Sequence, residues 1–300
     1  MTDAMSYYDA LDFGRMERGA TSAQGHESAN VSVRDLTRLL HIDYPDDAWL
    51  ARTTFALRRV REGEALVHAG DKFHSLYVVR SGCFKTVYTD FSGSEQVLGF
   101  PMCGDLMGAD GIDSGRYSST AVSLDTSEVV IVPLASLARL VCECPSLEAL
   151  LYRVLSRELV RVQNMAWTLG TLGAEGRVAS FLLSLSARLG ALGYSRCSFN
   201  LRMTRQEIGS YLGLKLETVS RALSALNSSG VIQVHQRSID IVDADALHGV
   251  IDLPASIPAG VAPPHPGPAP ARSRANNEAR ARKPRAQFPP TLAWRELAAV

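Results

Sequence analysis

The stretch MTRQEIGSYLGLKLETVSRALSALNSSGVI, from Met203 to Ile232, carries the strongest structural signal in this sequence of 300 residues. Thr204 followed three residues later by Glu207 has the form of a capping box, which begins a helix. Gly213 can end that helix by taking a left-handed conformation. A second helix is expected to open at Lys215. The stretch therefore predicts two short helices joined by a tight turn.

Three residues in this stretch have the spacing of a helix-turn-helix. Such a motif needs a small residue where the helices come closest, a glycine in the turn and a β-branched residue in the shared core. Gly209, Gly213 and Val219 meet these needs in order. The candidate DNA contacts lie on the polar face of the second helix and at the helix starts: Glu217, Ser220, Arg221, Thr204, Lys215 and Thr218.

The side chains on that polar face suit base recognition. Arg221 can donate two hydrogen bonds to guanine O6 and N7, Glu217 can accept one from a base amino group, and Ser220 can meet a base edge. An ordinary helical hairpin with a charged face is the alternative interpretation. The following segment, VIQVHQRSIDIV at 231–242, alternates like a β-hairpin with its turn near His235 to Arg237, and this addition favours a winged helix.

The region before this motif has two further sequence patterns. From Phe55 to Pro133, short β-rich runs separated by Gly and Asp predict a small antiparallel barrel or sandwich. Apolar residues then recur at steps of three and four from Leu147 to Leu169, which predicts one long helix, and a second helix follows with its apolar face from Val178 to Leu189. The fold class expected is α+β.

Composition limits the setting of the protein. Apolar residues make up 46% and charged residues 21%, the formal net charge is zero, and no run of about 18 uncharged apolar residues could span a bilayer. Five cysteines without a CxxC pair argue against a secreted disulfide framework and fit a reducing cytoplasm. The start of the chain has no apolar core of a signal peptide. We therefore expect a cytoplasmic protein that is neither exported nor embedded.

The two ends of the chain differ in composition from the middle. The stretch from Pro254 to Val300 holds ten of the fourteen prolines and carries seven basic against two acidic residues. A stretch with this composition cannot bury enough apolar surface to offset the loss of conformational entropy on folding, so we expect it to be disordered. Five segments are expected: a disordered leader at 1–30, a β-barrel domain at 31–143, a long helix at 144–172, a winged helix-turn-helix domain at 173–250 and a disordered tail at 251–300.

These motifs together resemble a transcription regulator of the CRP/FNR superfamily, on the FNR branch. The resemblance covers roughly residues 50 to 250, through GDKFHSLYVVRSGCFKTV from Gly70, GDLMG from Gly104, LDTSEVVIVP from Leu124 and above all MTRQEIGSYLGLKLETVSR. It implies an N-terminal cyclic-nucleotide-binding-like β-barrel (a double-stranded β-helix), a long dimerisation helix and a C-terminal winged helix-turn-helix.

The resemblance also implies partners. In FNR-like members an E-x-x-S-R triplet reads each TTGAT half of a palindrome, and here the triplet is Glu217, Ser220 and Arg221. The implied partners are double-stranded DNA of the form TTGAT-N4-ATCAA, a second copy of the chain and RNA polymerase, which relatives contact through regions that correspond to Phe91 to Glu95 and Gly190 to Arg196. The dimer face is expected on the long helix: Leu151, Val154, Leu155, Leu159, Val162 and Met165.

The sensor differs from that of oxygen-sensing relatives, which hold an iron-sulfur cluster on N-terminal cysteines and one from the barrel. Here no cysteine precedes Cys83, and Val130 stands at the expected fourth ligand. We therefore expect no such cluster and no resident cofactor or metal. Cluster-dependent relatives also carry an aspartate in the dimer seam, where two carboxylates repel each other. Val162 stands there instead, which predicts a regulator that dimerises and binds DNA constitutively.

Three other signals stay open. Cys83 and Cys103 can oxidise, as can Cys142 and Cys144 ahead of the long helix, and idle thiols are the alternative. Asp105 and Arg116 offer charges for a cyclic nucleotide, although Tyr117 follows the arginine where a serine is expected. His68 or His74 can serve haem, although a lone histidine in a loop is usually polar surface. These candidates are Cys83, Cys103, Cys142, Cys144, Cys197, Asp105, Arg116, His68 and His74.

An enzyme is the interpretation from another class, because small β-barrels of the cupin type can carry a metal. Such a site needs several histidines and a carboxylate that converge. The barrel segment offers only His68 and His74. That interpretation also leaves the helix-turn-helix without a role, so we expect a regulator and no enzymatic activity.

Overall fold

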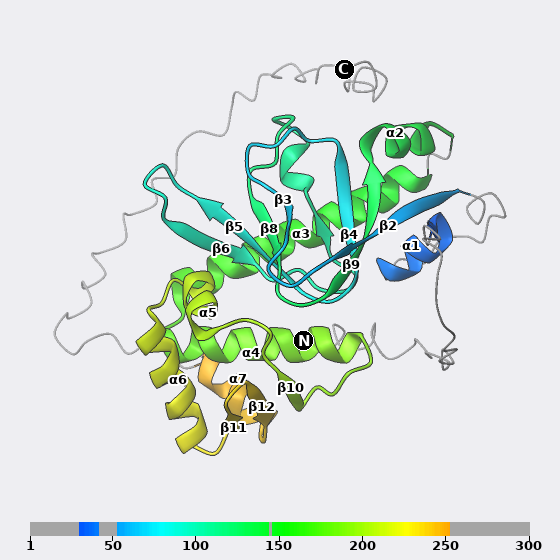
Figure 1. Cartoon of the computed structure of the whole chain (residues 1–300). Coiled ribbons are helices and arrows are strands. Elements are labelled where there is room, and N and C mark those ends of the chain that lie inside the picture. Colours follow the sequence, from blue (N-terminus) through cyan, green and yellow to red (C-terminus); the bar gives the residue numbers. More distant parts are fainter. Residues whose placement is uncertain (1–29, 42–52, 144–145, 253–300) are drawn as a thin grey trace, which may run out of the picture. The chain divides into compact units, whose positions relative to one another are not determined.

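A computed structural model describes residues 30–41, 53–143 and 146–252 (Figure 1). The disordered leader and tail expected at 1–30 and 251–300 fall outside these residues, except at their inner boundaries. The strands are β1 (Asn30–Ser32), β2 (Thr54–Val60), β3 (Ala65–Val67), β4 (Ser75–Ser81), β5 (Phe84–Thr89), β6 (Glu95–Gly99), β7 (Leu106–Met107), β8 (Thr120–Ser123), β9 (Ser127–Pro133), β10 (Ser198–Asn200), β11 (Ile232–His235) and β12 (Ser238–Ile241). The helices are α1 (Val33–Leu39), the 3-10 helix η1 (Ala109–Gly111), α2 (Leu134–Glu143), α3 (Ser146–Thr171), α4 (Ala174–Ala191), α5 (Arg205–Leu212), α6 (Leu216–Ser228) and α7 (Ala244–Asp252).

Strands β1 to β9 form a β domain of two antiparallel sheets. The strand orders are β1-β2-β9-β4-β7 and β3-β8-β5-β6. Strand β9 is central because its valines at 129, 130 and 132 are all buried, and it pairs with β2 on one side and β4 on the other. The β-rich domain predicted for this region is confirmed, and the hydrogen bonds of the described residues divide it into two sheets rather than one closed barrel.

One glycine shows why the turns of this domain carry the residues they do. Gly82 links β4 to β5 with a φ of 90°, a left-handed conformation that glycine adopts without strain. A Cβ added at this position would lie 2.1 Å from Oγ of Ser127. The turn therefore needs glycine for its backbone conformation and for the space beside β9.

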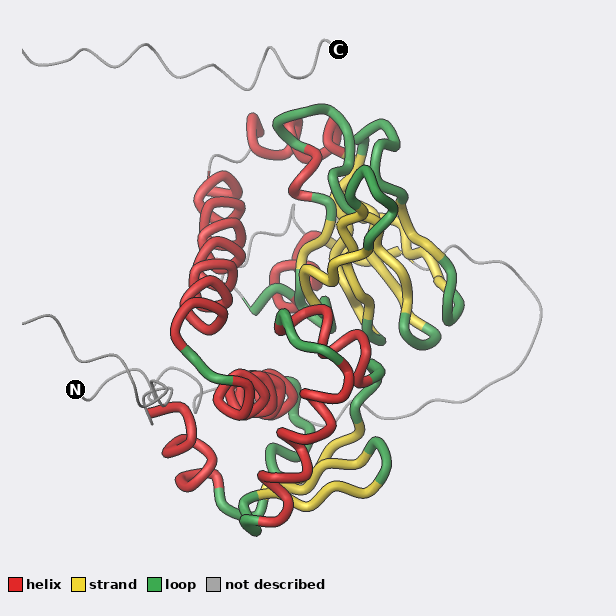
Figure 2. Tube along the Cα trace, turned by 90° about the vertical axis from the view of Figure 1, so that its left-hand side faces the viewer, coloured by secondary structure: helices red, strands yellow, loops and turns green. Residues whose placement is uncertain are grey.

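The predicted long helix is α3, which runs for 26 residues. It lies behind the strands in Figure 1 and beside them in Figure 2. Its first half packs into the core of the β domain: Leu147, Leu151 and Val154 are buried together with Leu36 and Leu40 from the N-terminal segment. The first half of α3 is thus part of the β domain.

The C-terminal half has the predicted winged helix-turn-helix. Helices α4, α5 and α6 pack with the sheet β10-β12-β11, and α7 lies against α4. The hairpin of β11 and β12 turns at Gln236, whose φ is 55°, inside the turn that the alternation predicts. The expected α+β fold class is confirmed. No helix among the residues described here is long and apolar enough to cross a bilayer.

The β domain and the DNA-binding half share a hydrophobic core. Val87, Val97 and Phe100 from the β domain belong to the same buried cluster as the side chains of α4, α5 and α6. Phe100, Phe181 and Tyr211 form an aromatic triangle with ring centroids 5.2 to 6.0 Å apart and edge-to-face geometry. This contact has no local pattern in the sequence, and we did not predict it.

Candidate nucleic-acid interface

Helix α5 begins with the predicted capping box. Thr204 is the N-cap residue: its Oγ1 accepts a hydrogen bond from the Glu207 backbone at 3.2 Å, and Oε2 of Glu207 accepts one from the Thr204 backbone at 2.7 Å. The Thr204 hydroxyl also donates to the same carboxylate at 2.9 Å. The hydroxyl of this candidate DNA contact is therefore used to fix the start of α5.

The same carboxylate connects α5 to the β domain. Nζ of Lys85, on β5, lies 2.7 Å from Oε1 of Glu207. Burial raises the pKa of Glu207, but the hydrogen bonds from Lys85 and Thr204 outweigh it, so the pKa lies below its usual range. On the neighbouring strand, the backbone N–H of Val97 donates to the Ser210 hydroxyl at 2.8 Å. The first helix of the motif is held against β5 and β6.

The two helices of the motif come closest at Gly209. A Cβ added there would lie 2.6 Å from the Leu214 carbonyl oxygen and 3.5 Å from Cγ2 of Val219. Gly213 ends α5 with a φ of 62°, and Val219 is fully buried. All three positions predicted from spacing have the expected geometry.

Replacing Gly209 by alanine is expected to lower the free energy of unfolding by about 1 to 3 kcal/mol, because the new methyl group overpacks a backbone contact that cannot move aside freely. Chemical denaturation measures this loss. Gly249→Ala in α7 is the matched control, since a Cβ there meets no atom within 4 Å and alanine favours a helix. Equal stability of the two variants would contradict the close approach.

The predicted reading face of α6 is accessible. Glu217 and Arg221 are exposed, Thr218 and Ser220 are partly exposed, and Lys215 is the exposed N-cap residue. Neither Glu217 nor Arg221 makes a hydrogen bond or ion pair with another described residue. Ser220 accepts a weak bond from Arg205 at 3.4 Å. The opposite face of α6 is buried, by Val219, Ala222, Leu223 and Leu226. The helix is thus amphipathic, with its charged side chains unengaged.

The predicted dimer face of α3 needs a correction. Leu151 and Val154 are only 6% and 4% exposed because they fill the core of their own β domain. Leu155 and Met165 are partly buried, and Met165 packs against the second core. Leu159 and Val162 are 59% and 65% exposed. The helix has two apolar faces, which cannot be told apart from the sequence pattern. The face with Leu151 and Val154 is buried in the protomer, and the face with Leu159 and Val162 is exposed to solvent.

The interior of the β domain does not fit a cyclic nucleotide. The ring of Tyr117 is 2% exposed, packs edge-on against Phe73 and donates a 2.7 Å hydrogen bond to the Ser75 carbonyl. Arg116, one of the two candidate ligands, donates to the Gly70 carbonyl at 2.7 Å. Asp105, the other, is engaged elsewhere, as described next. Aromatic side chains and protein hydrogen bonds occupy the groups that a nucleotide would need.

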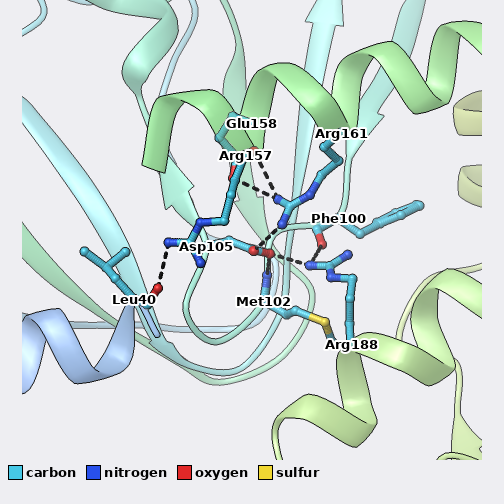
Figure 3. A network of polar contacts seen from close by, with 8 residues as sticks. All are labelled: Leu40, Phe100, Met102, Asp105, Arg157, Glu158, Arg161 and Arg188. Atoms are coloured by element: carbon cyan, nitrogen blue, oxygen red, sulfur yellow. Dashed lines mark hydrogen bonds and ion pairs between the residues drawn. The ribbon is translucent and has the colours of Figure 1, made fainter. Parts of the chain in front are cut away.

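Asp105 is the centre of an ionic network that joins the β domain, α3 and α4 (Figure 3). Its side chain is 9% exposed and pairs with Arg161 of α3 at 2.8 Å and with Arg188 of α4. Arg161 also pairs with Glu158 at 3.0 Å. Burial raises the pKa of Glu158. One buried carboxylate therefore holds two guanidinium groups from different helices.

The thiols and histidines offer no assembled site. Burial raises the pKa of Cys83 to about 12 and raises the pKa of Cys103, so both stay protonated thiols near neutral pH. Both are free, as are the exposed Cys142 and Cys197, while Cys144 lies outside the described residues. His68 and His74 are exposed in loops. Within the described ranges, no three His, Cys, Asp or Glu side chains are grouped to hold a metal ion.

The position expected for the fourth ligand of an iron-sulfur cluster is occupied by an aliphatic residue. Val130 is fully buried in β9, where it pairs with Leu57 of β2 and Val78 of β4. A valine side chain cannot ligate iron, so the residues here do not fit an iron-sulfur cluster that needs a thiolate at this point.

Comparison with known proteins identifies both halves of the chain. Residues 57–143 match the cyclic nucleotide-binding domain family and residues 176–250 the Crp-like helix-turn-helix domain family. The chain is 42% identical over 193 residues to the transcriptional regulatory protein btr of Bordetella pertussis, covering 64% of this chain and 80% of the relative. It is 40% identical over 188 residues to the fumarate and nitrate reduction regulatory protein of Escherichia coli K12, covering 63% and 75%.

A solved structure agrees with these relatives. FixK2 from Bradyrhizobium japonicum is similar with a TM-score of 0.61 and 28% identity, over 68% of this chain and all of that one. The fold described above is thus similar to a solved structure over about two thirds of the chain. The chain belongs to the CRP/FNR family of DNA-binding transcription regulators.

Proposed function

We propose that this regulator binds, as a homodimer, a palindrome of the form TTGAT-N4-ATCAA in the cytoplasm, and that its role is regulatory rather than enzymatic. The observation that carries the proposal is the exposed face of α6, where Glu217 and Arg221 lie one helical turn apart with no partner among the described residues. A dimer places two such helices about one turn of DNA apart.

The proposed contacts divide by role. Glu217, Ser220 and Arg221 read bases, and Lys215 and Thr218, near the start of α6, contact phosphates or base edges. Thr204 positions the start of α5 near the phosphate backbone, since its hydroxyl serves the cap. Glu217 is the one carboxylate of α6. Little negative charge on this face therefore opposes the approach of DNA phosphates.

The proposed homodimer forms through the outward face of α3. Leu159 and Val162 are exposed apolar side chains one turn apart on this face. Two such faces bury each other in a parallel pair. Because Val162 brings no charge to the seam, we propose that pairing and DNA binding need no cofactor.

RNA polymerase is the proposed partner for activation. The loop between β5 and β6 displays Phe91, which is fully exposed, beside the acidic Glu95. The segment from Gly190 to Arg196 after α4 is the second proposed contact.

An electrophoretic mobility shift with the TTGAT palindrome, run in air and without oxygen, tests the proposal. We expect equal retardation in both conditions and loss of retardation when both half-sites are scrambled. Strict loss of binding in air would contradict constitutive binding, and equal retardation of scrambled DNA would contradict the proposed target sequence.

A further inference from the structure

A cleft of about 770 Å³ lies between α3, the loop from Met102 to Asp105 and the end of α4. Its most frequent lining residue is arginine: Arg153, Arg157 and Arg161 come from α3, Arg188 from α4, and Arg196 from the segment that follows α4. Asp105 is the single carboxylate that lines it, as far as the described residues go. The cleft is therefore strongly basic.

The acidic groups near the cleft do not balance these arginines. Asp105 pairs with Arg161 and Arg188, and Glu158 pairs with Arg161 again. Arg157 donates only to a neutral group, the Leu40 carbonyl, at 2.7 Å (Figure 3). Arg153 makes no hydrogen bond or ion pair with any described residue. A third carboxylate, Glu148, accepts a hydrogen bond from Tyr152 of the lining. With five arginines and three carboxylates, the site keeps an excess of two positive charges.

The crowding of positive charge has a visible electrostatic effect. Burial lowers the pKa of Arg157. Glu158 raises it in part, and the neighbouring Arg153 and Arg161 lower it. Burial and Arg157 likewise lower the pKa of His41, which also lines the cleft. Arg188 lies in the last turn of α4, where a cation is favourable in any case. No such reason applies to Arg153 and Arg157, which lie inside α3.

The backbone makes room for the guanidinium groups. Gly190 lies under the side chain of Arg196, since a Cβ at Gly190 would be 2.4 Å from Cγ and Nε of that arginine. Gly193 beside it also lines the cleft. The segment that follows α4 therefore brings the guanidinium group of Arg196 to the cleft lining.

The spacing of the arginines selects a ligand with several anionic groups. Positions 153, 157 and 161 follow each other at one turn of α3, or about 6 Å along its axis. Arg188 of α4 and Arg196 of the segment after α4 line the same cleft. A guanidinium matches phosphate with two parallel hydrogen bonds. The cleft volume also lies in the range of small-molecule sites, about 300 to 1,000 Å³. Tyr152 adds an exposed aromatic ring to the lining.

We propose that this cleft binds a small anion with two or more phosphate groups, of the nucleoside triphosphate or inorganic polyphosphate class. It differs from the predicted cyclic-nucleotide site: the two share Asp105, but neither Arg116 nor Tyr117 lines the cleft. The aromatic ring of Tyr152 offers a stacking surface for a base. The ligand reaches Arg161 and Arg188 in competition with Asp105, at the contact that joins the β domain to α4.

Isothermal titration of the full-length protein tests the site. The probes are ATP, GTP, CTP and UTP, inorganic tripolyphosphate, and adenosine as the probe without phosphate. We expect saturable binding of tripolyphosphate or of at least one nucleotide, with one site per protomer, and none of adenosine. Tighter binding of a nucleotide than of tripolyphosphate assigns the site to nucleotides, and the reverse order assigns it to inorganic polyphosphate.

The double variant Arg153→Gln, Arg157→Gln locates the binding. It is expected to weaken binding at least about tenfold, because two charged hydrogen-bonding groups are lost. Both side chains are exposed, so an unchanged thermal midpoint checks that the variant folds. Arg139→Gln is the matched control, because Arg139 is an exposed arginine on another helix, α2. Arg221→Gln is a second control, since the DNA-reading face also attracts phosphate.

Three results would overturn the proposal. These are the absence of binding for every phosphate probe, equal binding by wild type and the double variant, and a loss in Arg221→Gln as large as that in the double variant. None of them depends on operator recognition, which is measured separately with DNA.

Discussion

Replacing Val162 by aspartate is expected to separate the proposed dimer and to abolish binding to the palindrome at nanomolar protein. The substitution removes an apolar contact and places two carboxylates against each other in the seam. Each valine that is fully buried contributes about 1.5 to 3 kcal/mol, so the loss of two copies corresponds to at least about a hundredfold in the dissociation constant. Analytical ultracentrifugation at several protein concentrations measures the dissociation constant of the dimer.

Val160→Asp is the matched control for this experiment. Val160 is 49% exposed on the same helix and lies two residues before Val162, about 200° around the axis. Because both valines are exposed in the protomer, neither aspartate is expected to unfold it. The interpretation fails if both variants dimerise as wild type, or if both lose dimerisation to the same extent.

Replacing Arg221 by alanine is expected to weaken binding by about 1 to 3 kcal/mol for each half-site, because a bidentate contact with guanine is lost. The loss concerns one base pair, so the variant is expected to accept other bases there while it keeps its preference elsewhere. The exposed position of Arg221 on α6 makes a loss of folding unexpected.

Binding to a set of palindromes with single base changes checks this expectation. Arg139→Ala, which removes an exposed arginine from α2, is the control and is expected to bind like wild type. A uniform loss across all sequences, with the specificity profile unchanged, would show that Arg221 contacts phosphate and does not read a base.

The helix-turn-helix was predictable because its determinants are local. Thr204 and Glu207 are three residues apart, and Gly209, Gly213 and Val219 act through backbone conformation and close packing within one short segment. Each residue type has a direct physical reason at its position. The two helices, the caps of α5 and the polar face of α6 are therefore predictable from the sequence.

The links between the two halves were not predictable in this way. Lys85 and Glu207 are 122 positions apart, and Asp105 and Arg188 are 83 apart. No periodicity reports such pairs, because the two residues of each pair lie far apart in the sequence. The same limit explains Leu151 and Val154: an apolar stripe on α3 shows that a face is covered, but not whether the β domain or a second subunit covers it.

The aromatic triangle of Phe100, Phe181 and Tyr211 sets a rule for building hybrid regulators. A chimaera with its junction in the connection before α4 would join the β domain of another protein to helices α4 to α6. Such a junction would separate side chains that belong to one hydrophobic core. Phe100 would then meet side chains that did not evolve beside it. A functional chimaera must transplant the β5–β6 strands together with α4 and α5, or redesign both surfaces at once.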